Sequence, residues 1–201
     1  MNATLNMVSN LISTETILKI EGLAEPIVSS EGCKLYDIEF SGGGGGRILR
    51  VYIDKAVEGG PTLDDCAKVS RALNALLDEG DPIPGGNYHL EVSTPGIERP
   101  LRKPWHFAEV SGKKIWMQLN QRLQDFGLQN QKIANSKKLE EVVQSSDENG
   151  VRFKIEDEEI LIPFAAIEKA HVVYEFNPNA KKPEKKNPNF RVKLKGKKKK
   201  N

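Results

Sequence analysis

Long apolar runs are missing from this chain of 201 residues, in which charged residues make up 29% and aromatic residues only 6%. No stretch approaches the roughly 20 apolar residues that a membrane-spanning helix needs. The first fifteen residues contain neither a basic leader nor an apolar run, so they do not match a secretory signal. We therefore expect a cytoplasmic protein without a membrane partner.

Cysteine is also scarce, since Cys33 and Cys66 are the two that the sequence contains. The first lies at the start of an expected strand and the second lies within an expected helix. In the reducing compartment expected above, we predict two free thiols, and a structural disulfide is the alternative.

The residue patterns of metal, cofactor and nucleophile sites are missing as well. The three histidines, His89, His106 and His171, fall on separate expected elements, with no second ligand at metal-binding spacing. The glycine run 42–46 lacks the Lys-Ser/Thr ending of a phosphate-binding loop and precedes a strand, so it predicts a hairpin tip. We expect a binding protein that has no metal, no cofactor and no catalytic residues.

Charge, in contrast, is abundant and unevenly distributed. Residues 1–98 hold seven basic and fifteen acidic side chains, a net charge of −8. Residues 99–176 hold twelve of each, and residues 177–201 hold eleven basic and one acidic, a net charge of +10. The first segment should therefore attract a cationic partner, and the last segment a polyanion.

Hydrophobic periodicity in residues 1–98 predicts an α-β-β-α-β domain with two helices on one face of a three-stranded sheet. The expected helices run from about residue 14 to 29 and from Thr62, the N-cap, to Gly80. The expected strands cover residues 34–40, 48–53 and 88–93, and Leu35 should face away from Tyr36 and Ile38. Pro26 could kink the first helix or end it early.

Two adjacent carboxylates, Asp64 and Asp65, open the second of these helices. Adjacent helical residues diverge by about 100°, so the two cannot close on one metal ion. Carboxylates at this end complement the helix dipole. We expect both to be candidate contacts to a basic protein.

The segment YHLEVSTPGIERPL, residues 88–101, leaves a strand through a sharp turn. Pro95 restricts Thr94 to extended geometry, and Gly96 permits a positive φ. We predict an interdomain hinge here and a linker at residues 99–104, and a catalytic role for Ser93, Thr94 and Glu98 is the alternative. Glu98 and Arg99 could hydrogen-bond across the junction. The hinge residues are Ser93, Thr94, Pro95, Gly96, Glu98, Arg99 and Pro100.

After the linker, residues 105–176 predict a small closed β-barrel, which would give the whole chain an α+β fold. Five expected strands cover residues 113–119, 137–144, 151–155, 159–162 and 170–176. The polar segment 121–136 fits no strand and predicts a long loop or a short helix. Residues 177–201 are rich in lysine and proline and poor in apolar side chains, so they predict a disordered tail.

Two of these segments, GGPTLDDCAKVSRALNALLD at residues 59–78 and YHLEVSTPGIERPL, are similar to signature segments of the ribosome maturation factor RimP family. The order of elements is also similar, and so is the late motif IPFAAIEKAHVV at residues 162–173. The resemblance spans roughly residues 12–176. The chain departs from the family in its five-glycine loop, in the length of segment 121–136 and in the strand KKLEEVVQ.

The resemblance implies a KH-like N-terminal domain, an Sm- or SH3-like barrel, and a cytoplasmic assembly factor. Such a factor binds the free small ribosomal subunit late in maturation, and its barrel engages small-subunit ribosomal protein twelve. No catalysis and no cofactor are implied. A free-standing RNA-binding regulator is the alternative, although the chain lacks a G-x-x-G loop and an exposed aromatic pair in a base-stacking pattern. An enzyme that acts on ribosomal RNA is a third hypothesis.

Charge refines this expectation, since the acidic first domain should contact protein while the tail binds rRNA without sequence preference. A tail that only keeps the chain soluble is the alternative. We expect a monomer. The candidate RNA-contacting residues are Arg99, Arg102, Lys103, Lys193, Lys195, Lys197, Lys198, Lys199 and Lys200.

Overall fold

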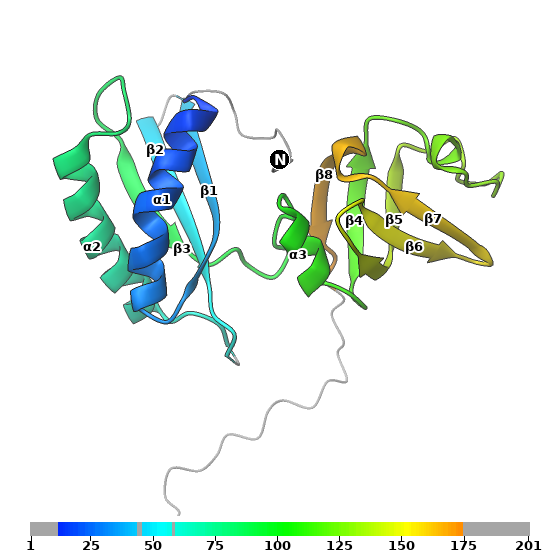
Figure 1. The fold of residues 1–201 in the computed structure, drawn as a ribbon, viewed down its shortest axis with the longest axis horizontal. Coiled ribbons are helices and arrows are strands. Elements are labelled where there is room, and N and C mark those ends of the chain that lie inside the picture. Colours follow the sequence, from blue (N-terminus) through cyan, green and yellow to red (C-terminus); the bar gives the residue numbers. More distant parts are fainter. Residues whose placement is uncertain (1–11, 44–45, 58, 175–201) are drawn as a thin grey trace, which may run out of the picture.

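The computed structural model describes residues 12–43, 46–57 and 59–174, which form two domains side by side (Figure 1). The fold is mixed α+β, with an α-β-β-α-β domain followed by a β-rich domain, as the sequence predicts. In the described residues, no helix is long and apolar enough to cross a membrane.

The N-terminal domain packs two helices on one face of a three-stranded sheet. Its elements are α1 (Thr14–Ser30), β1 (Lys34–Gly43), β2 (Gly46–Asp54), α2 (Leu63–Gly80) and β3 (His89–Ser93). The strands follow the order β1-β2-β3, with β1 antiparallel and β3 parallel to β2. The core includes Ile20, Phe40, Leu49, Val69 and Leu73. Helix α1 continues through Pro26, so this residue does not end it early.

Strand β1 contains a β-bulge that the alternating sequence pattern conceals. The pairing shifts register between Leu35 and Asp37, which leaves Tyr36 as an extra residue. Leu35 packs against the same core as Ile38, three residues later, so the expectation that these two face opposite sides is wrong. Tyr36 and Asp37 contact residues of the linker and of the second domain instead.

The C-terminal domain is a five-stranded antiparallel sheet with the order β7-β6-β5-β4-β8. Its strands are β4 (Lys114–Leu119), β5 (Lys138–Ser146), β6 (Val151–Ile155), β7 (Glu158–Ile162) and β8 (Ile167–Val172). Strands β4 and β8, the first and last of the domain in chain order, pair with each other, and the short 3-10 helix η2 (Phe164–Ala166) connects β7 to β8. Strands β7 and β8 are the two ends of the sheet order, so the described strands do not close into the barrel that the sequence predicted. Segment 121–136 contains a 3-10 helix, η1 (Leu123–Phe126), so a short helix is found where one was expected.

Strand β8 begins three residues before the expected start at Ala170 and ends at Val172. A register shift opposite Gln118 and Leu119 makes Glu168 an extra residue. The inward residues Ile167 and Ala170 are consequently three apart, which breaks the alternation that identifies a strand.

A short helix that the sequence pattern does not reveal, α3 (Pro104–Glu109), lies between the two domains (Figure 1). Phe107 and Val110, at its end, belong to the C-terminal core together with Leu101. Residues within the expected linker 99–104 therefore pack with the C-terminal domain. Six residues are too few to show a helical period, but Pro104 at the first helical position is a start signal.

Candidate functional site at the domain junction

The turn between the domains has the geometry that its proline and glycine indicate. Gly96 adopts φ 77°, a conformation that L side chains rarely adopt. Ser93 ends β3, and Ile97 and Glu98 form an exposed turn. Glu98 and Arg99 were both expected to hydrogen-bond across the junction. Arg99 does so, with Asp54, whereas the Glu98 carboxylate makes no hydrogen bond or ion pair among the described residues.

The chain after this turn extends the C-terminal sheet. The amide of Val172 donates to the carbonyl of Arg99 at 3.2 Å, and the amide of Leu101 donates to the carbonyl of Ala170 at 2.9 Å. Pro100 and His171 form an isolated antiparallel bridge between these bonds. The linker thus covers the free edge of β8, which would otherwise expose unpaired backbone groups.

Three cations of the linker form ion pairs with the N-terminal domain. Arg99 lies 2.5 Å from Asp54, Arg102 lies 2.8 Å from Asp37, and Lys103 lies 2.7 Å from Glu21. Arg102 also approaches Glu39 at 3.6 Å. Acidic residues of the same chain therefore already partner the three linker cations named as candidate RNA contacts.

Asp37 is the most buried carboxylate of this network, with 7% of its side chain exposed. Burial raises the pKa of Asp37, while Arg102, Lys103 and the amide of Ile38 act in the opposite direction. A buried carboxylate depends on such partners, because desolvation disfavours its charged form. Arg102 is therefore a structural counter-ion for Asp37.

His106 joins the linker, α3 and β1 through both of its ring nitrogens. Nδ1 accepts hydrogen bonds from the amides of Arg102 at 3.0 Å and Lys103 at 3.2 Å. Since Nδ1 must then be unprotonated, Nε2 carries the proton and donates to the carbonyl of Tyr36 at 3.1 Å. Burial lowers the pKa of His106 to about 3, so the ring is neutral near neutral pH.

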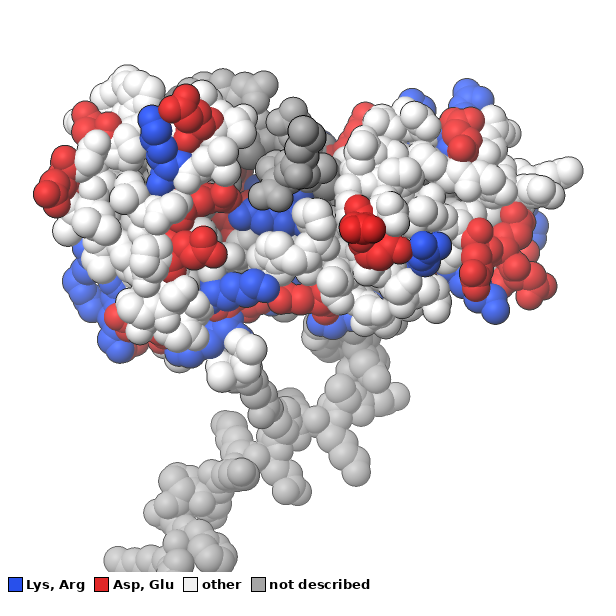
Figure 2. Space-filling view, in the orientation of Figure 1, with Lys and Arg blue, Asp and Glu red and all other residues white. Residues whose placement is uncertain are grey.

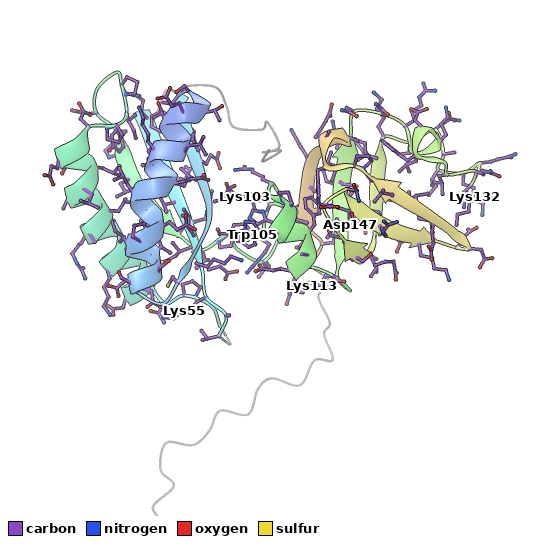
Figure 3. The ribbon with its side chains drawn as sticks, in the orientation of Figure 1. Lys55, Lys103, Trp105, Lys113, Lys132 and Asp147 are labelled. Atoms are coloured by element: carbon purple, nitrogen blue, oxygen red, sulfur yellow. The ribbon has the colours of Figure 1, made fainter. Side chains whose placement is uncertain are left out.

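Aromatic contacts complete the junction. The rings of Tyr36 and His106 stack with their centroids 4.0 Å apart, and the Tyr36 hydroxyl donates to the carbonyl of Pro100 at 2.7 Å. Trp105 meets Tyr36 edge-on, and the Lys34 ammonium lies 3.4 Å from the Trp105 ring centroid. Figure 3 shows Trp105 between the domains, close to Lys103.

A groove of about 460 Å³ crosses this junction on the side where Lys55 and Lys113 lie (Figure 3). Its charged lining is mixed, with the carboxylates of Asp54 and Glu109 among several cations. Lys34 pairs with Glu109 at 2.7 Å. Among the described residues, no group of His, Cys, Asp or Glu could hold a metal ion. Hydrogen bonds and ion pairs of the junction residues connect the two domains.

Comparison with known families now identifies the N-terminal domain. Residues 23–98 match the family model described as RimP N-terminal domain. The chain therefore contains a RimP N-terminal domain. RimP proteins are ribosome maturation factors and are not known as a family of enzymes. The match ends one residue before Arg99, so the linker cations lie outside it while their partners Asp37, Glu39 and Asp54 lie inside.

The two acidic candidates of the RimP domain differ in their surroundings. Asp65 forms a capping box with Thr62, accepts from Lys55 at 3.1 Å and is nearly buried. Hydrogen bonds from the backbone and hydroxyl of Thr62 lower the pKa of Asp65 to about 2. Asp64 is exposed and pairs with Lys68 at 2.9 Å. Asp65 therefore stabilises the start of α2, and Asp64 remains accessible to a partner.

The six tail lysines named as RNA contacts, from Lys193 to Lys200, lie outside the described residues. Sequence reasoning missed the principal junction residues inside the described part of the chain. They are Glu21, Lys34, Tyr36, Asp37, Asp54, Trp105 and His106. The bulge at Tyr36 breaks the alternation of β1, and α3 is too short to show a helical period. Pro104, at the first helical position, was the one local sign of α3.

Proposed function

We propose that this RimP-family chain binds the free small ribosomal subunit and assists its late assembly. The match of residues 23–98 to the RimP N-terminal domain carries this proposal. The packed junction supports it, since a factor of two domains with one relative orientation can contact two parts of a large particle at once. Neither domain needs to transform a substrate in this role.

The C-terminal domain is proposed to bind ribosomal protein twelve of the small subunit. Its surface supports a cationic partner at one place, the β6–β7 turn. The turn itself is Glu156 and Asp157, and the first two residues of β7, Glu158 and Glu159, continue the acidic run; three of these four residues are exposed. Figure 2 shows acidic side chains gathered at the end of the domain where β6 and β7 meet. Basic extensions of ribosomal proteins would be attracted there.

Contacts to rRNA are proposed to come chiefly from the tail rather than from the linker. The linker cations Arg99, Arg102 and Lys103 are held by acids of the N-terminal domain. Residues 177–201 carry a net charge of +10, enough for several phosphate contacts. Asp64 is the remaining candidate of the first domain for a contact to protein.

Sedimentation tests this proposal. The tagged full chain should migrate with free small subunits in a sucrose gradient and be absent from whole ribosomes. Replacing Glu156, Asp157 and Glu159 with glutamine should weaken this migration, because the attraction to a basic protein is removed. The matched control replaces Asp78, Glu79 and Asp81, near the end of α2, with their amides.

Migration with whole ribosomes as well as free subunits would contradict the proposal. So would cells that lack the chain and accumulate no immature small subunits. Sequence-selective binding to short RNAs without any subunit association would favour the free-standing regulator instead. An equal loss in the control variant would show that charge in general, rather than the β6–β7 turn, drives the association.

A further inference from the structure

The outer face of β4 and β8 carries an aromatic pair whose members lie 55 residues apart in sequence. Trp116 and His171 pair directly across the two strands, and their rings stack with centroids 5.0 Å apart and planes 27° apart. Both side chains are half-buried. Within the described part of the chain, neither the indole N–H nor the imidazole nitrogens form a hydrogen bond. The pair therefore presents both ring surface and unused polar atoms.

A groove of about 390 Å³ adjoins this pair. Such a volume lies within the ~300–1,000 Å³ range of small-ligand pockets. The backbone pairings arrange its lining as two rows across the strands. Pro100, His171 and Trp116 form an apolar row, because Pro100 and Trp116 both lie opposite His171. Arg102, two residues after Pro100 in the linker, and Lys169, two residues before His171 in β8, also line the groove and form a cationic row.

The two cations differ in availability. Arg102 is held by Asp37 at 2.8 Å. Lys169 is exposed and forms no ion pair among the described residues, and it lies opposite Gln118. Glu168, the nearest acid in sequence, accepts a hydrogen bond from Gln118 at 2.8 Å. Lys169, without an ion pair among the described residues, thus lies beside an aromatic surface.

We propose that this groove binds one unpaired RNA nucleotide, with the base stacked on the Trp116–His171 pair and a phosphate on Lys169. Every base has a π-face, so an aromatic platform with an adjacent cation suits single-stranded RNA without sequence preference. The position of the tail adds a second argument. The lysine-rich segment starts at residue 177, six residues after His171, and at most about 20 Å of chain separates them. RNA bound at the start of this segment would therefore be within reach of the groove.

The inference goes beyond the proposed function, because it assigns a single-stranded RNA site to a domain proposed above to bind protein. It also identifies a half-buried aromatic pair that lies too far apart in sequence to form a recognisable motif. The two roles need not compete, since the β6–β7 turn and the β4–β8 face belong to different ends of the sheet order.

Intrinsic fluorescence of the full chain tests the inference with two probes of similar charge, a short oligoadenylate and a short RNA duplex. Stacking of a base on Trp116 should quench its emission with oligoadenylate, while the duplex, whose bases are already stacked, should bind the tail without quenching. Trp116→Phe should keep a stacking ring and abolish the quench. Trp116→Ala should weaken oligoadenylate binding about ten-fold, the order expected for one stacked base, and leave duplex binding unchanged.

Matched variants separate the site from general charge. Lys169→Gln and His171→Ala should each weaken oligoadenylate binding, whereas Lys132→Gln and His89→Ala, at exposed positions away from the groove, should not. Lys132 lies at the far end of the C-terminal domain in Figure 3. Circular dichroism of each variant checks the fold, and Trp116→Phe serves if Trp116→Ala unfolds.

An absence of quenching, or equal effects on oligoadenylate and duplex, would overturn the inference. Quenching by a proline-rich or basic peptide but not by oligoadenylate would also overturn it and make the groove a protein-docking site. A chain that still sediments with free small subunits in either case would lose the stacking site and keep the proposed function.

Discussion

Replacing Arg102 with methionine should destabilise the protein by about 3 kcal/mol at neutral pH. The substitution leaves the Asp37 carboxylate, with 7% of its side chain exposed, without the guanidinium that lies 2.8 Å away. Removing one partner of a buried pair costs about 3–5 kcal/mol. The lower end applies here, because Arg102 is itself 22% exposed and the amide of Ile38 still donates to Asp37 at 3.0 Å.

The loss should depend on pH in a defined direction. Burial already raises the pKa of Asp37, and removing Arg102 removes an opposing cause, so the folded-state pKa rises further. A raised carboxylate pKa gives stability that is present below the unfolded value near 3.8 and is lost as pH rises through the folded value. The difference between variant and wild type should therefore be small near pH 4 and reach its full size at neutral pH.

Urea denaturation at several pH values, followed by circular dichroism and tryptophan fluorescence, measures this difference. Arg152→Met is the matched control, since Arg152 and Asp147 form a 2.9 Å pair with side chains 49% and 40% exposed, and its loss should cost under about 1 kcal/mol. The double variant Asp37→Asn/Arg102→Met should recover much of the stability. A loss that does not change with pH, or that is no larger than in the control, would refute the role assigned to Arg102.

Three further predictions concern other parts of the chain. Burial lowers the pKa of His106 to about 3, so the free energy of unfolding of the wild type should fall as pH drops from about 6.5 towards 3, by at most about 1.4 kcal/mol per pH unit. Urea titrations at several pH values should show that His106→Gln flattens this dependence. Gly150→Ala should lower the melting temperature, because the added Cβ would lie 2.3 Å from the carbonyl oxygen of Ile162. Gly22→Ala in α1 is the control: its Cβ would have no atom within 4 Å, and alanine should stabilise the protein by up to about 1 kcal/mol through its higher helix propensity. Deleting residues 177–201 should flatten the salt dependence of RNA binding, whose log–log slope is about −4 if roughly five tail cations sit on phosphates; an unchanged slope would reject the role of the tail.

The sequence by itself determined most of the elements, because their signals are local. The stripe from Val69 to Leu77 and the Thr62 cap define α2, and alternation defines β2 and β6. The STPG turn and the family motifs of the first domain were also readable without coordinates. Charge segregation likewise follows from counting residues along the chain.

Only the tertiary structure decided how the domains are joined and which residues meet. The extra residue at Tyr36 reverses the alternation of β1, and it thereby turns Tyr36 and Asp37 towards the linker. Pairing of distant strands brings Trp116 to His171. A bulge and a long-range strand pairing leave no periodic trace in sequence, because each depends on partners that the chain meets only once it has folded.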